Sequence, residues 1–136
     1  MLFDGIADRV LAMCAEVAAP ESDVRVERCG EFGVLPAEVA TPLAMILTEL
    51  VQNAVEHAGA TLIEARVERA EGRLTLVVRD DGRGLPAGFD LAGSTRLGLQ
   101  IVRTLVESEL RGTLALDSVP SGGTEASVVV PLSAAG

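Results

Sequence analysis

The stretch Leu47-Thr-Glu-Leu-Val-Gln-Asn-Ala-Val-Glu-His57 decides the fold of this chain, because it joins an apolar helical face to a polar stripe. Its leucines, its first valine and its alanine recur at the spacing of an amphipathic helix. Glu49, Asn53 and His57 follow one another at i, i+4 and i+8, so they share a stripe that drifts by about 40° per step. The helix therefore carries three polar groups at the edge of its buried face.

This polar stripe is suited to hold a metal ion. The amide oxygen of Asn53 can ligate Mg²⁺, a hard cation that prefers oxygen and keeps water and phosphate oxygens as its other ligands. Glu49, one turn away, can hold a metal-bound water or accept a proton from a nucleophile. A solvated edge of an amphipathic helix is the alternative interpretation, and it is favoured as long as the helix is considered alone.

The segments around this stretch alternate between helix and strand patterns. Helical spacing of apolar residues occurs in segments 3–18, 35–58 and 97–110. Strand patterns occur in segments 24–28, 62–69, 74–78, 113–117 and 125–130. Pro42 inside the second helix predicts a kink or a fresh start. This order predicts the α+β class, as a two-layer α/β sandwich with helices on one face of a mixed, mostly antiparallel sheet.

The segment Asp80-Asp-Gly-Arg-Gly84 follows an apolar strand and is suited to contact a nucleotide base. At the strand's end, the carboxylate of Asp80 can accept a bond from an exocyclic amine such as adenine N6. Gly82 and Gly84 let the backbone approach a ring and its phosphates closely. An ordinary Asp-Gly turn is the alternative, and it is the stronger interpretation in isolation. The spacing matches neither the GxGxxG nor the GxxxxGK[ST] phosphate-binding motif.

Two further segments can complete such a site. Leu97-Gly-Leu99 opens a helix, whose first N–H groups can cradle a phosphate, with Gly98 allowing close approach. The preceding Arg96 either reaches that phosphate or is simply solvated. Gly122-Gly-Thr124 precedes the last strand, and its threonine hydroxyl can join the adenine edge, directly or through a water. A plain hairpin turn would explain the two glycines equally well.

The composition excludes several classes of protein. A length of 136 residues suits one domain, and the net charge of −9 lacks the basic footprint of a general nucleic-acid binder. Two distant cysteines and one histidine do not form a zinc site. The sequence shows no signal-peptide pattern and no apolar run of membrane-spanning length, so we expect a cytoplasmic location.

Together, the four motif segments resemble the ATP-binding catalytic domain of sensor histidine kinases, which has the Bergerat fold shared with Hsp90, MutL and type II topoisomerases. The resemblance covers roughly residues 22–132 and leans toward the subgroup with the second type of dimerisation and phosphoacceptor domain. It implies that residues 21–136 form the ATP-binding catalytic domain. Residues 1–20 are then an N-terminal helix, expected to be the tail of a dimerisation domain outside this chain or, alternatively, a helix that packs on the sheet.

The resemblance also implies a function and a set of site residues. The domain would bind ATP and Mg²⁺ and donate the γ-phosphate to a histidine on a separate phosphoacceptor domain. By this resemblance Glu49 assists phosphoryl transfer, Asn53 holds Mg²⁺ and Asp80 reads adenine. The other residues expected to bind ATP are His57, Gly82, Gly84, Leu85, Arg96, Leu97, Gly98, Leu99 and Thr124.

The expected partners are the dimerisation and phosphoacceptor domain of the same kinase and a downstream response regulator. In the subgroup this regulator is often an RNA-binding antiterminator. We expect the isolated domain to be monomeric, to contact neither nucleic acid nor membrane, and to be unable to autophosphorylate without its phosphoacceptor domain.

Two departures from the family pattern keep alternatives open. Glu56 occupies a position that is often basic in the family, and the expected lid, segment 85–95, is short. One alternative is an anti-sigma-factor serine kinase of the same fold. Another is a non-catalytic nucleotide-binding interaction module. In either case, a glycine-containing lid between two firm elements predicts mobility without nucleotide.

Overall fold

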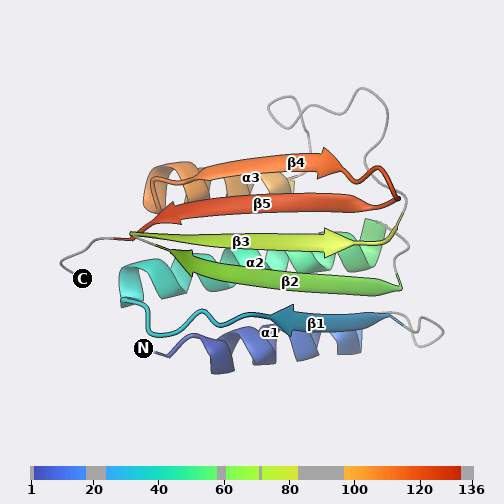
Figure 1. The fold of residues 1–136 in the computed structure, drawn as a ribbon, viewed down its shortest axis with the longest axis horizontal. Coiled ribbons are helices and arrows are strands. Elements are labelled where there is room, and N and C mark those ends of the chain that lie inside the picture. The colour runs from blue at the N-terminus through green and yellow to red at the C-terminus, as the bar shows by residue number, and fades with distance from the viewer. Residues whose placement is uncertain (1, 18–23, 58–60, 71, 83–96, 133–136) are drawn as a thin grey trace.

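The computed structural model describes residues 2–17, 24–57, 61–70, 72–82 and 97–132. Within them, the helices lie together behind a five-stranded sheet, so the molecule has two layers (Figure 1). The elements are α1 (Asp4–Val17), β1 (Arg25–Cys29), α2 (Ala37–His57), β2 (Leu62–Ala70), β3 (Arg73–Asp80), α3 (Leu97–Thr104), a π-helical turn η1 (Leu105–Glu109), β4 (Thr113–Ser118) and β5 (Thr124–Pro131).

The sheet has the strand order β1-β2-β3-β5-β4. β1 runs parallel to β2, and every other neighbouring pair is antiparallel. The predicted α+β class is therefore confirmed, including the mixed, mostly antiparallel sheet and the helices on one face. Because β3 lies between β2 and β5, the end of β3 is held by the start of β2 on one side and by the start of β5 on the other.

The core fills the space between the two layers with aliphatic side chains. α2 lies behind the middle of the sheet (Figure 1), and its fully buried residues are Leu43, Ile46, Leu47 and Val51. Strand residues that face the helices alternate with exposed ones, as in β3, where Leu74, Leu76 and Val78 are buried. The side chain of Asp80 continues this inward-facing row and so points toward the helical layer.

Pro42 lies inside α2, which continues without interruption from Ala37 to His57. Of the two expectations for Pro42, the fresh helix start is therefore wrong, and the kink stays a prediction. Proline removes only its own N–H, which would otherwise bond to the carbonyl of Glu38 in the first turns. Burial of the apolar stripe on the rest of α2 outweighs that loss.

α1 shares the core of the rest of the chain. Phe3 and Phe32 are fully buried, with their ring centroids 4.7 Å apart. The carboxylate of Asp4 accepts bonds from the backbone N–H groups of Phe32, at 2.7 Å, and Gly33, at 3.0 Å. These contacts make α1 part of this fold. Its expected role as the tail of a dimerisation domain stays a prediction.

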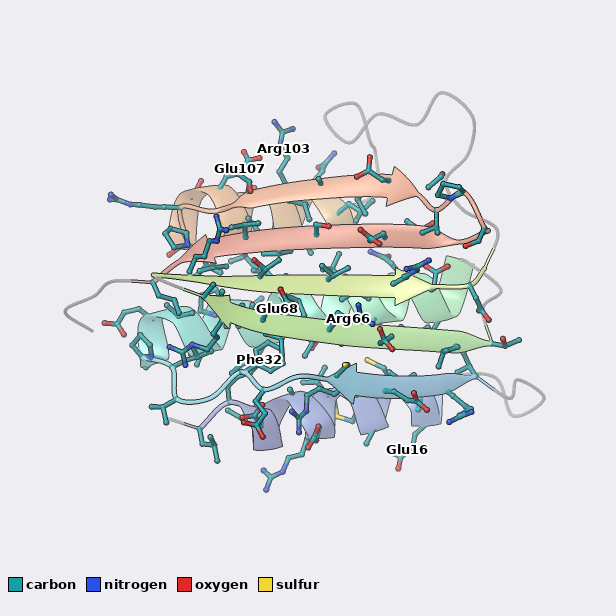
Figure 2. The ribbon with its side chains drawn as sticks, in the orientation of Figure 1. Glu16, Phe32, Arg66, Glu68, Arg103 and Glu107 are labelled. Carbon is teal, nitrogen blue, oxygen red and sulfur yellow. The ribbon has the colours of Figure 1, made fainter. Side chains whose placement is uncertain are left out.

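The predicted helix over residues 97–110 is α-helical only as far as Thr104. It ends in the wider π-helical turn, in which the N–H of Leu110 donates to the carbonyl of Leu105 at 3.0 Å. Arg103 and Glu107 form an ion pair of 3.2 Å across this change and lie side by side in Figure 2. Just after this turn, Gly112 lies against the backbone of Val129, where an added Cβ would be 2.1 Å from the carbonyl oxygen.

Candidate functional site

Asp80 is the only charged side chain that is buried among the described residues, with an exposed fraction of 6%. Its Oδ1 accepts two backbone bonds, from the N–H of Gly82 at 2.9 Å and from the N–H of Thr124 at 3.3 Å. Burial raises the pKa of Asp80 above its ordinary value, and the charge of Asp81 adds to this, while the two N–H bonds oppose it. The fold therefore keeps a carboxylate with reduced hydration at the end of β3.

Gly123 brings the start of β5 against this strand end. Its φ is +98°, and a Cβ placed there would lie 1.9 Å from the carbonyl oxygen of Asp80. Only glycine permits that approach, which sets the N–H of Thr124 within reach of the Asp80 carboxylate. The contact found is made by the Thr124 backbone, and the role of its hydroxyl at the adenine edge stays a prediction. Gly123 was missed as a site residue, although the Gly-Gly-Thr pattern points to it.

Glu49 and Gly98 bring α2 and α3 together. A Cβ on Gly98 would lie 2.5 Å from Oε2 of Glu49, so the missing side chain leaves room for this carboxylate. A negative charge beside the first turn of a helix is electrostatically favourable. The predicted phosphate cradle at Leu97-Gly-Leu99 is thus located at the carboxylate expected to assist transfer. Leu99 itself is 3% exposed and packs in the core.

Asn53 lies one turn beyond Glu49 on α2 and has an unsatisfied buried atom. Its Nδ2 has no hydrogen-bond partner among the described residues. A buried polar atom without a partner costs free energy, so such an atom in a folded protein indicates a missing ligand. The nitrogen and oxygen of an amide are assigned from their partners, so a ligand could bond to either. An unpartnered Nδ2 suits an acceptor such as a phosphate oxygen, and the role of Asn53 in holding Mg²⁺ stays a prediction.

For the other predicted residues, the structure gives at most a position in a helix. His57 is the last residue of α2, and Leu97 is the first residue of α3. The predictions for Gly84, Leu85, Arg96 and the lid at 85–95 fall outside the described residues. In the part of the chain that the structure describes, no three His, Cys, Asp or Glu side chains gather in a way that could hold a metal ion.

A cavity of about 280 Å³ lies beside the same strand end, but on the other face of the sheet. Its lining residues are Leu62, Glu64, Arg79, Asp80, Asp81, Ser121 and Gly122. Glu64 and Arg79 are opposite one another in the β2–β3 register, and they alternate with the buried residues that face the helices. Figure 2 shows the same sheet face further along β2, at Arg66 and Glu68. Asp80 is thus the one inward-facing strand residue in this lining.

The geometry of the site and the comparisons with known proteins lead to the same family. The sequence profile of the histidine kinase-, DNA gyrase B- and HSP90-like ATPases matches residues 38–134, and the chain belongs to this family. The resemblance to the ATP-binding domain of sensor histidine kinases is thereby confirmed.

Individual relatives make the likeness more specific. The chain is 51% identical over 136 residues to the sensor histidine kinase PdtaS of Mycolicibacterium smegmatis, covering 95% of this chain and 27% of that protein. It is 45% identical over 134 residues to PdtaS of Mycobacterium tuberculosis, with the same coverage of both chains. This chain therefore spans about a quarter of the length of these relatives.

Solved structures share the fold. The blue-light activated histidine kinase EL346 of Erythrobacter litoralis superposes with a TM-score of 0.86 at 25% identity, covering 97% of this chain and 42% of that one. The ATP binding domain of PrrB from Mycobacterium tuberculosis has a TM-score of 0.75 at 25% identity, covering 98% and 96%. Among the described residues of our chain, none of the helices is long and apolar enough to cross a membrane.

Proposed function

We propose that this chain binds Mg-ATP between α2 and the strand ends and acts as the catalytic domain of a two-component sensor histidine kinase. The observation that carries the proposal is the Asp80 carboxylate, which is buried at the end of β3 and bonded to two backbone N–H groups. Membership of the ATPase family supports it, as do relatives that are named sensor histidine kinases.

Asp80 is suited to recognise adenine. Both backbone bonds from described residues end on Oδ1, and in the proposed complex Oδ2 accepts the exocyclic amine of the base. Because the Asp80 carboxylate is largely shielded from water, a hydrogen bond to it contributes more than it would in bulk water. The amine would also favour the ionised form and so lower the pKa that burial has raised. A ligand with a carbonyl in place of that amine would bind less well, because its carbonyl oxygen and the Asp80 carboxylate are both hydrogen-bond acceptors and would repel one another.

Asn53 and Glu49 are suited to the phosphate end of ATP. Mg²⁺ bound there would neutralise phosphate charge, with Asn53 as a protein oxygen ligand and with phosphates and water as the remaining ligands. In this arrangement the amide oxygen of Asn53 would ligate Mg²⁺, and the unpartnered Nδ2 would donate to a phosphate oxygen. Glu49 lies beside Gly98 at the start of α3, where it can orient a water or accept the proton of the attacking group.

In the proposed reaction, the γ-phosphate passes to a histidine on the dimerisation and phosphoacceptor domain. Phosphoryl transfer relies on positioning and charge stabilisation more than on covalent chemistry by the protein. The catalytic domain alone would therefore bind ATP without labelling itself. The phosphate would then pass to a response regulator, of the RNA-binding antiterminator type in this proposal, in the cytoplasm.

Calorimetric titration tests the nucleotide site. ATP is added to the wild-type chain, with and without Mg²⁺, and the titration is repeated with Asn53→Ala and Asp80→Asn. We expect saturable binding by wild type, loss of the Mg²⁺ dependence in Asn53→Ala, and loss of ATP binding in Asp80→Asn. A folded wild-type chain that binds no adenine nucleotide would overturn the proposal.

Phosphotransfer tests the catalytic role. The chain, γ-labelled ATP and a phosphoacceptor domain from a PdtaS relative are mixed, and the labelled product is treated with acid and with alkali. Label that is lost in acid but kept in alkali is expected for phosphohistidine. Acid-stable label would indicate the serine kinase alternative. Binding without any transfer would indicate the non-catalytic module.

A further inference from the structure

Asp81 is bound differently from its neighbour Asp80. Its carboxylate accepts three bonds from the start of β2: from the N–H of Thr61 at 2.7 Å, from the Thr61 hydroxyl at 2.5 Å, and from the N–H of Leu62 at 3.0 Å. The hydroxyl bond is the largest contribution lowering the pKa of Asp81, and the pKa of Asp80 is raised. The carboxylate of Asp81 is therefore hydrogen-bonded to other protein groups, and the carboxylate of Asp80 is held close to the helical layer.

The bonds of Asp81 join three strands at one corner of the sheet. Its own N–H donates to the carbonyl of Leu62 at 3.3 Å, so the backbone at Asp81 is tied to β2 as well as the side chain. The carbonyl of Thr61 accepts the N–H of Arg25 at 2.9 Å, which attaches the start of β1 to the same point. A substitution of Asp81 should therefore loosen the hydrogen bonds that link the ends of β1, β2 and β3.

The same corner determines where the Asp80 carboxylate lies. Asp81 is the middle residue of the turn in which the N–H of Gly82 donates to Oδ1 of Asp80. The other bond to that oxygen comes from Thr124 on β5, across the strand from β2. If Asp81 were released from Thr61, the turn could rotate, and the Asp80 carboxylate would lose the fixed direction that recognition of a base requires.

We infer that Asp81 is a positioning residue of the nucleotide site, which holds Asp80 in the orientation that reads adenine without contacting the nucleotide itself. The inference rests on the proposed function. It assigns Asp81 and Thr61 a role in distinguishing adenine from other bases, although neither residue is among the predicted ligand contacts.

The first test needs no nucleotide. Amide hydrogen exchange at Gly82 and Thr124 is measured by NMR in wild type, Asp81→Asn and Thr61→Val. The control is Asp117→Asn, which removes the same charge from an exposed residue of β4 near the same end of the sheet. We expect both variants to raise exchange at the two amides by about fivefold, with the control unchanged. Unchanged protection in Asp81→Asn would overturn the inference.

The second test separates positioning from a general loss of stability. The affinities for ATP and for inosine triphosphate, which carries a carbonyl in place of the adenine amine, are compared in the same variants. We expect Asp81→Asn to lower the preference for ATP by about fivefold, and Thr61→Val combined with it to add little, because both act on the bond between the Thr61 hydroxyl and the Asp81 carboxylate. Equal weakening of both nucleotides would show an effect on the fold alone and would overturn the inference.

The two tests also separate this inference from the proposed function. If wild type bound no nucleotide, the proposed function would fail, and the inference about reading adenine would fail with it. Exchange at Gly82 and Thr124 would still decide whether Asp81 fixes the Asp80 carboxylate.

Discussion

At the scale of single residues, the adjacent carboxylates Asp80 and Asp81 divide two tasks between them. Asp81 faces the start of β2 and accepts three bonds from it, whereas Asp80 faces the helices and, among the described residues, accepts backbone bonds on Oδ1 alone. The alternation of side chains along a strand separates them, because neighbouring residues point to opposite faces. A donor that approaches from the helical side therefore meets the carboxylate of Asp80.

Asp80→Asn should stabilise the empty domain at neutral pH while abolishing ATP recognition. Since the pKa of Asp80 is raised in the folded state, its neutral form is favoured by folding, and the ionised form costs stability as the pH rises through the folded pKa. Asparagine keeps an acceptor for Gly82 and carries no charge. Thermal unfolding at pH 7 should show a higher midpoint for the variant. A lower midpoint would contradict this balance.

Gly123→Ala should destabilise the domain by about 2–4 kcal/mol, because the new Cβ collides with the backbone of Asp80 and the residue has a positive φ. ATP binding should be lost with it. Gly5→Ala is a matched control: it lies in α1 with no atom within 4 Å of the added Cβ, so it should stabilise by about 0.5–1 kcal/mol. Urea unfolding measures both. Equal effects of the two substitutions would refute the steric argument.

At the scale of elements, α1 is fastened to the rest of the domain by two carboxylates of different burial. Asp4 bonds to two backbone N–H groups and to Arg28, and its side chain is 17% exposed. Asp8 bonds to the same arginine, at 2.7 Å, but its side chain is 57% exposed. Water screens the outer pair, so the two residues should differ in their contribution.

Asp4→Ala should destabilise the domain by roughly 2–3 kcal/mol, because it leaves the N–H of the buried Phe32 without an acceptor. Asp8→Ala should cost no more than about 1 kcal/mol. Chemical unfolding of both variants beside wild type measures the difference. If Asp8→Ala proved the more costly substitution, the backbone bonds of Asp4 would not be what holds α1.

At the scale of the whole molecule, acid should weaken the fold through particular carboxylates. The pKa of Asp8 is lowered chiefly by its bond to Arg28, and that of Asp81 by its bond to Thr61. A lowered folded pKa gives stability that is present above the unfolded value, about 3.9, and is lost as the pH falls through the folded value. Asp80 acts with the opposite sign.

The urea midpoint should therefore fall between pH 5 and pH 3, values chosen to bracket about 3.9. The fall should be smaller in Asp8→Asn and Asp81→Asn than in wild type, since asparagine does not titrate. Asp117→Asn serves as the control, because no partner of Asp117 is found among the described residues. A slope that is identical in all four proteins would show that these two carboxylates do not determine acid stability.

The sequence predicted most of the elements, because their periodicities are strong. The apolar stripe of α2 and the alternation of β2 and β3 gave nearly the observed bounds. Pro42 misled the prediction because a local rule about proline was outweighed by burial over the whole helix. The π-helical end of the third helix was also missed, since apolar spacing does not reveal a change in hydrogen-bond register.

By itself, the sequence determined the fold class and the family and nominated the polar residues of the candidate site, since these follow from periodicity and from the order of short motifs. Only the tertiary structure decided which groups meet. It placed Glu49 against Gly98 and Gly123 against the carbonyl of Asp80. It also brought the Thr61 hydroxyl within hydrogen-bond distance of the Asp81 carboxylate. Spacing along a chain fixes which face a side chain occupies. Contacts between distant segments depend on how helices and strands pack, which no local pattern encodes.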